Sequence, residues 1–239
     1  MKIDINKDYV ITINREVGSG GRTVGQMLAQ RLGVPFYDKA LINALTEMYH
    51  LSVEEIEELK DGQPPYNQKL VNALAEHYHL TPQELEQIKS HDDWDNFWKH
   101  ATASTNMAAT LAELNKSEGM PTTEDIYKAE TEFLMNLADS GPCVMAGRSG
   151  YYVLRSHPNH MSVFIQASLE HRIKRVMRRQ EVSRKEAEDI IERVDRMRED
   201  YMRRYTGTTR YNTHNYDLVI NMDGMTEEKA VKIICDYIE

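Results

Sequence analysis

The amino-acid sequence predicts an α/β fold: a parallel sheet with helices on both faces and one α-helical insertion. Short apolar runs, each followed by a helical pattern, stand near the N-terminus and again in the C-terminal half. Apolar strands that alternate with helices are typical of parallel sheets buried on both sides. Between the first and second of these units, residues 38–140 are poor in strand signals, which indicates the insertion.

The first unit lies within the first 33 residues. The run Tyr9–Ile13 is rich in β-branched residues and predicts a strand. A glycine-rich loop follows it. Val24, Leu28 and Leu32 then recur at helical spacing, so the order strand, loop, helix is expected.

Three more apolar runs predict strands in the C-terminal half: Cys143–Ala146, Met161–Ile165 and Tyr216–Ile220. A helical pattern follows each of them. Because ligands of parallel α/β folds bind at the carboxyl ends of the strands, a binding site is expected at that edge of the sheet.

The predicted insertion contains an internal repeat, since residues 33–61 recur as residues 62–90 with 14 identical positions. Chance would give about two identities, so the repeat is a duplication. Each copy has the pattern of a helix, a Ser or Thr cap and a second helix. Two copies are too few for a solenoid, and we interpret the second as enlarging a helical arm. The aromatic residues Trp94, Phe97 and Trp98 have the spacing of core packing.

Charge is unevenly distributed along the chain. The net charge of −9 argues against general nucleic-acid binding. Residues 168–210 nevertheless contain 13 Lys and Arg against 9 Asp and Glu. A basic segment in an acidic protein fits a polyphosphate substrate, and it equally fits a helical surface covered with salt bridges.

The sequence has no apolar run long enough to span a membrane and no apolar N-terminal stretch of the kind found in signal peptides. Cys143 and Cys235 both lie in apolar segments, where reduced, buried thiols are expected. These features predict a cytoplasmic protein that does not bind membranes.

The loop Gly18–Thr23 provides the chemistry of an anion site, because its N–H groups and the following helix N-terminus favour negative charge. Compared with the phosphate-loop motif G-x-x-x-x-G-K-[ST], the loop is degenerate. With Gly20 as the second glycine, Arg15 stands at the first glycine and Gly21 at the lysine. The alternative is that the loop only makes a tight connection between the strand and the helix. The preceding strand and the Arg22–Thr23 pair favour phosphate binding, with Arg22 carrying the charge that a lysine would supply.

Further motifs are spread over the chain: Thr12–Arg22, Phe36–Lys39, Val144–Arg148, Ala167–Arg175, Asp195–Arg198, Tyr205–Gly207 and Asn215–Asn221. Together they resemble the cytidylate kinase-like family of P-loop proteins. The resemblance covers about residues 8–40 and 125–238. It implies a P-loop NTPase fold in which residues 1–239 form one kinase domain. Residues 38–140 would be an arm that binds the nucleoside monophosphate, and residues 168–210 a lid.

Residue roles follow from the resemblance and from the loop. The expected ATP phosphate-binding residues are Gly18, Ser19, Gly20, Gly21, Arg22 and Thr23. The expected acceptor-binding residues are Asp38, at the end of a short second strand, Arg148, Asp195 and Arg198. The expected catalytic residues are Arg22, Arg172, Arg175 and Arg198. The Thr23 hydroxyl is the expected Mg²⁺ ligand.

The activity implied is ATP-dependent phosphoryl transfer to a nucleoside monophosphate, with CMP favoured as acceptor. The expected partners are small-molecule nucleotides, and the oligomeric state stays open. Ser149 stands where cytidylate kinases have an acidic residue. A kinase for another small molecule is therefore an alternative. A nucleotide-binding module with little catalysis is a second one, because the loop lacks its lysine.

Helical periodicity and the resemblance disagree over residues 183–205. At 100° per residue, the predicted buried stripe contains Ile190, Val194, Met197, Tyr201 and Tyr205. Glu188, Glu192, Asp195 and Glu199 lie roughly opposite and are expected to be solvated. Periodicity therefore favours Arg193, Arg196 and Arg203 as phosphate contacts. The resemblance favours Asp195 and Arg198, and we follow it more firmly for Arg198.

Overall fold

The computed structural model describes residues 3–38, 53, 56, 121–147 and 149–238. The chain divides into two units, one formed by Met1–Leu41 with Thr131–Glu239 and the other by Ile42–Glu130. The sheet described below belongs to the first unit. Most of the predicted helical arm, nearly all of the repeat and the Trp94 cluster lie outside the described residues.

Five parallel strands form the sheet, in the order β2-β3-β1-β4-β5. Their bounds are β1 Val10–Arg15, β2 Phe36–Asp38, β3 Cys143–Ala146, β4 His160–Gln166 and β5 Leu218–Asn221. All four apolar runs predicted as strands lie in this sheet. The central strand β1 pairs with both β3 and β4, so the loop that follows it leaves the middle of the carboxyl edge.

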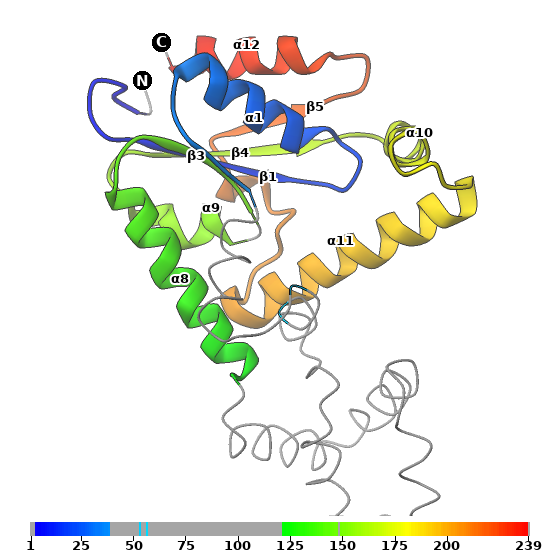
Figure 1. The fold of residues 1–239 in the computed structure, drawn as a ribbon, viewed down its shortest axis with the longest axis horizontal. Coiled ribbons are helices and arrows are strands. Elements are labelled where there is room, and N and C mark those ends of the chain that lie inside the picture. The colour runs from blue at the N-terminus through cyan, green and yellow to red at the C-terminus, as the bar shows by residue number, and fades with distance from the viewer. Residues whose placement is uncertain (1–2, 39–52, 54–55, 57–120, 148, 239) are drawn as a thin grey trace, which may run out of the picture. The chain divides into compact units, whose positions relative to one another are not determined.

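Helices cover both faces of the sheet, as predicted (Figure 1). α1 and α12 lie on one face, and α9 and the C-terminal part of α8 lie on the other. The bounds are α1 Gly21–Leu32, α8 Thr123–Asp139, α9 Gly150–Val153, α10 Leu169–Gln180, α11 Arg184–Thr206 and α12 Glu227–Ile238, with 3-10 turns η1 Leu154–Ser156 and η2 Thr213–Asn215. No described helix is both long enough and apolar enough to cross a membrane.

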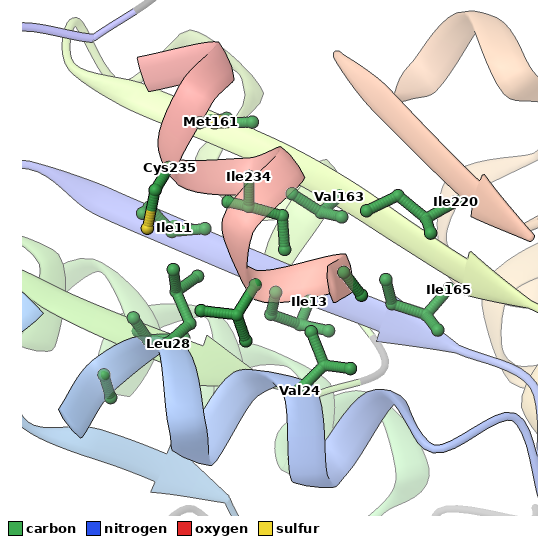
Figure 2. Close-up of a cluster of buried hydrophobic side chains, with 14 of the residues drawn as sticks. Ile11, Ile13, Val24, Leu28, Met161, Val163, Ile165, Ile220, Ile234 and Cys235 are labelled. Atoms are coloured by element: carbon green, nitrogen blue, oxygen red, sulfur yellow. The ribbon is translucent and has the colours of Figure 1, made fainter. Parts of the chain in front are cut away.

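The core follows from the period of two along the strands. Ile11 and Ile13 of β1 are fully buried on the face covered by α1 and α12, where Leu28 packs against them (Figure 2). Val10, the residue that alternates with them, is buried on the opposite face with Leu134 of α8. A strand that is buried on both faces has apolar residues at consecutive positions in the sequence, and this pattern predicted the sheet.

The basic segment forms a helical hairpin of α10 and α11. Ile173 and Val176 of α10 pack against Ala187 and Ile191 of α11, and Val17 of the loop after β1 joins this cluster. The hairpin therefore packs against the loop after β1 through apolar contacts, which do not depend on its charged residues.

Candidate functional site

The glycine-rich loop between β1 and α1 needs two of its glycines for conformational reasons. Gly18 and Gly20 have φ angles of 80° and 90°, which side-chain-bearing residues rarely adopt. A Cβ on Gly18 would also lie 2.7 Å from the carbonyl oxygen of Arg172, at the start of α10. Glycine at position 18 thus lets the backbone of α10 approach the loop.

Ser19 shapes the loop from inside. The residue is fully buried, and its N–H and hydroxyl both donate to the carbonyl of Glu16, at 3.3 and 2.9 Å. Its side chain therefore closes the turn, while the loop precedes the first turn of α1. The N–H groups of a helical first turn have no carbonyl partner within the helix and can bind an anion.

Asp38, the last residue of β2, lies between two arginines. Its Oδ1 accepts from Nη2 of Arg15 at 3.1 Å, and its Oδ2 pairs with Nε of Arg22 at 2.5 Å. The side chains of Asp38 and Arg15 are 6% and 15% exposed, whereas that of Arg22 is 62% exposed. The pair with Arg15 joins the carboxyl ends of β1 and β2 across β3, where the ligand edge was expected, and the pair with Arg22 joins β2 to the start of α1.

Asp195 lies in the middle of α11 and supports the loop. Its Oδ1 accepts from the N–H of Val17 at 3.1 Å, and its Oδ2 pairs with Arg172 at 2.5 Å. The expectation from periodicity that Asp195 is solvated is wrong, because only 8% of the residue is exposed. Arg172 and Arg210 neutralise the carboxylate, so its burial costs far less than that of an unpaired charge.

The sequence analysis did not identify Arg210, although its guanidinium is central to this network. Its side chain is 1% exposed and contacts Oδ1 of Asp195 at 3.5 Å. It also donates to the backbone carbonyl of Arg15, and it lies 5.2 Å from the centre of the Tyr211 ring. In the sequence, Arg210 differs from other residues only by its positive charge at the end of the basic segment. The solvent-exposed arginines nearby carry the same charge, so this signal does not single it out.

Arg198 and Arg172 contact the backbone of the same stretch. Arg198 donates to the carbonyl of Arg15 at 3.5 Å, and Arg172 donates to that of Val17 at 3.4 Å. Nε of Arg172 lies 3.7 Å from the carboxylate of Glu16. The three arginines at positions 172, 198 and 210 therefore hold the backbone of residues 15–17.

Arg175 and Arg179 of α10 approach the other end of the loop. Each donates to the hydroxyl of Thr23, at 3.2 Å in both cases. The guanidinium of Arg175 also lies against Gly20, where an added Cβ would be 3.3 Å from its Cζ. Arg175 pairs with Glu227 at 2.7 Å. Burial acts to raise the pKa of Glu227, but hydrogen bonds from a backbone N–H and from Arg175 outweigh it and hold the pKa below its ordinary value.

The surroundings of Thr23 do not fit a divalent cation. Two guanidinium groups donate to its hydroxyl oxygen, and their charge disfavours a second cation there. Among the residues that the structure describes, no group of three or more His, Cys, Asp or Glu side chains is arranged to hold a metal ion. Mg²⁺ binding by Thr23 remains a sequence-based prediction that this arrangement does not favour.

The structure brings most of the predicted site residues to one edge of the sheet. Gly18, Gly20 and Thr23 line the loop, and Arg175 and Asp38 lie at its two sides. Arg148 lies outside the described residues. Next to it, Ser149 is fully buried at the start of α9.

Solved structures resemble this chain at low identity. An uncharacterized protein from Eubacterium ventriosum is 21% identical, with a TM-score of 0.61 over 96% of this chain and 98% of that one, and supports the fold alone. A shikimate kinase from Bacteroides thetaiotaomicron is 14% identical over 96% of this chain and 98% of that chain, with a TM-score of 0.44.

Two comparisons of sequence differ in how much of the chain they cover. A uronate isomerase from Corynebacterium glutamicum is 31% identical to this chain over 134 residues. These residues make up 56% of this chain and only 23% of the isomerase. The sequence model of the cytidylate kinase-like family matches residues 10–224, which include every strand of the sheet and the whole α10–α11 hairpin. With its five-stranded parallel sheet and its glycine-rich loop after β1, the chain belongs to the cytidylate kinase-like family.

Proposed function

We propose that the protein transfers the γ-phosphoryl group of ATP to a nucleoside monophosphate, with CMP as the acceptor. The observation that carries this proposal is the loop between β1 and α1, which two positive-φ glycines shape and which arginines flank on both sides. An anion that binds such a loop meets backbone N–H groups and guanidinium charge together.

ATP would supply the phosphoryl group, as its magnesium complex, and the metal would enter as part of this substrate. An oxygen of the acceptor phosphate attacks the γ-phosphorus, and the bond from that phosphorus to the β,γ-bridging oxygen breaks. ADP and a nucleoside diphosphate result. Because the acceptor oxygen is already a nucleophile, the protein needs no general base, and its task is to position and neutralise the phosphates.

The arginines would divide this task by position. Arg175, which lies against Gly20, is placed to contact the donor phosphates. Arg22, which pairs with Asp38, would lie between donor and acceptor in this proposal. Arg172 and Arg198 contact the backbone of residues 15–17, so in this arrangement they orient the loop. Preorganised charge of this kind stabilises the transition state of phosphoryl transfer.

The acceptor would bind near Asp38, with Arg148 proposed to hold its phosphate. The support is the position of Asp38 at the carboxyl end of β2, together with membership in a cytidylate kinase-like family. We propose a cytoplasmic setting for the reaction. The free, buried thiols of Cys143 and Cys235 suit a reducing compartment.

A coupled assay of ADP formation with CMP, UMP, AMP, GMP and dCMP tests the proposal. We expect turnover that depends on the acceptor and is fastest with CMP. ADP formation that is the same with and without every acceptor would refute monophosphate kinase activity. Fastest turnover with a different monophosphate would correct the acceptor alone.

Nucleotide binding with little catalysis is a second candidate function, and one observation favours it. Gly21 stands at the position of the phosphate-loop lysine, whose charge normally reaches the β- and γ-phosphates. Binding of ATP measured by calorimetry, without ADP formation in the assay above, would support this second function over the first.

A further inference from the structure

The space for a side chain at position 21 is already filled. A Cβ built on Gly21 would lie 2.5 Å from Cβ of Arg15 and 3.1 Å from Cβ of Ile165. Real Cβ atoms do not approach one another so closely, and Cβ of Arg15 is fixed to the end of β1. A lysine at position 21 would therefore displace Arg15 or the strand end.

Arg15 and Gly21 occupy complementary positions of the motif. In G-x-x-x-x-G-K-[ST], the first position is glycine and the seventh is lysine. In this chain the first is Arg15 and the seventh is Gly21. The two residues are adjacent in space, so the chain has exchanged them: the long cationic side chain starts from the strand, and the glycine starts the helix.

The backbone of Arg15 is held firmly. Its N–H donates to the side chain of Asn14 at 2.9 Å, and its carbonyl accepts from Arg198 and Arg210. The side chain reaches Asp38 at 3.1 Å and is 15% exposed, so its guanidinium is buried along most of its surface and directed along the carboxyl edge of the sheet. A preorganised charge loses little conformational entropy when it binds a phosphate.

Resting on the proposed function, we infer that Arg15 supplies, from the end of β1, the phosphate-contacting positive charge that the lysine supplies in the ordinary motif. Arg15 is then a catalytic residue, which contacts the phosphates as they transfer. Arg22, which the sequence analysis assigned to this role, is 62% exposed and paired with Asp38.

Four variants test the exchange. Arg15→Met keeps an unbranched apolar stem beside Gly21 and removes the charge, and we expect kcat/KM to fall about 100-fold. Arg15→Gly is expected to be equally poor. Arg15→Gly combined with Gly21→Lys puts glycine at the first and lysine at the seventh position of the motif, and we expect at least a tenfold recovery over Arg15→Gly, roughly the rate effect of one phosphate contact. Gly21→Lys alone is expected to lose activity through the clash with Arg15.

Arg31→Ala is the matched control, because it removes the same charge from the exposed last turn of α1. Binding of ATP and of inorganic tripolyphosphate is measured by calorimetry for every variant, and thermal unfolding reports folding. We expect Arg15→Met to fold with a lowered unfolding temperature, because Asp38 loses one of its two cationic partners, and to bind tripolyphosphate about tenfold more weakly. If Arg15→Met fails to fold, the comparison of Arg15→Gly with the Arg15→Gly, Gly21→Lys double variant tests the inference.

The outcomes separate the two hypotheses. In one outcome, the wild type binds tripolyphosphate and forms ADP, and kcat/KM of Arg15→Met stays within about threefold of the wild-type value. This result would overturn the role of Arg15 and leave the proposed function intact. If kcat/KM of the Arg15→Gly, Gly21→Lys double variant is no higher than that of Arg15→Gly, the proposed exchange is overturned and the proposed function again stays intact. A wild-type protein that binds neither ATP nor tripolyphosphate would overturn the proposed function, and the inference with it.

Discussion

Asp195 accepts a hydrogen bond from the backbone N–H of Val17 at 3.1 Å, which ties the middle of α11 to the loop that precedes α1. The two residues are 178 positions apart in sequence. The same carboxylate pairs with two buried arginines, so charge and backbone geometry are coupled at this point.

Asp195→Asn is expected to destabilise the protein. The amide can still accept from Val17, but Arg172 and Arg210 lose their counter-charge inside the molecule, at a cost of about 3 kcal/mol or more. Urea denaturation measures the free energy of unfolding. Asp200→Asn, on an exposed position of the same helix, is the control and should change it by less than about 0.5 kcal/mol.

The family resemblance instead assigns Asp195 to the acceptor nucleotide. A variant with wild-type stability and a raised KM for the acceptor alone would support that assignment and contradict the role in supporting the loop. Loss of stability with weaker binding of both substrates is the result that the observed contacts predict.

Gly18→Ala is expected to weaken ATP binding about tenfold or more, because the new Cβ would lie 2.7 Å from the carbonyl oxygen of Arg172 and displace the loop from α10. Gly33→Ala is a matched control. Gly33 also has a positive φ, of 69°, but an added Cβ meets no described atom within 4 Å. Alanine at either position adopts a positive φ, which costs on the order of 1 kcal/mol.

Thermal unfolding and calorimetric titration with ATP distinguish the two glycine variants. Gly33→Ala should bind ATP as the wild type does despite its lower stability. Equal ATP affinities for Gly18→Ala and Gly33→Ala would show that close approach of α10 to the loop is unimportant for binding.

Local patterns in the sequence predicted much of the fold. The strands β1, β3, β4 and β5 each overlap an apolar run, because most of their residues are buried or half-buried. The order of the strands could not be read in this way. It depends on pairings such as Val10 with Cys143, between residues more than a hundred positions apart.

The candidate site was less accessible to sequence reasoning. Gly18 and Gly20 were recognisable, because the strand before the loop and the Arg22–Thr23 pair after it favoured phosphate binding over a tight connection. Asp195 was misplaced by periodicity because the partners that make its burial favourable, Val17 and Arg172, come from other segments. The exchange of Arg15 with Gly21 becomes visible only when the spatial distance between their side-chain positions is known.

The α10–α11 hairpin is expected to act as a lid. Arg175 and Arg179 of α10 both donate to the Thr23 hydroxyl at the loop's helical end, and a bound polyphosphate would give both a stronger partner. Amide hydrogen exchange in α10 should therefore slow by about tenfold when ATP and CMP are added. The buried part of α12 around Ile234 is the internal control and should not change. Exchange in α10 that is insensitive to nucleotides would contradict the lid.

Asp38 and the duplicated segment offer an internal comparison within the chain. The first copy carries Asp38, and the second carries Asn67 at the equivalent position. Asp38 holds Arg15 at 3.1 Å and Arg22 at 2.5 Å, so its carboxylate sets the direction of two cationic side chains at the strand ends. Asn67 lies outside the described residues, and its side chain is neutral.

Asp38→Asn should lower kcat/KM about 100-fold, because the neutral amide no longer holds the two guanidinium groups in place and misplaced charge is costly in phosphoryl transfer. Asn67→Asp should leave kcat/KM within about threefold of the wild type, since no role in the proposed site is assigned to the second copy. The stability cost of Asp38→Asn is limited on the Arg22 side, where a side chain that is 62% exposed can turn to water. The coupled ADP assay and thermal unfolding, run on both variants, provide the measurement. Equal effects of the two substitutions on turnover would mean that Asp38 does not serve the acceptor site.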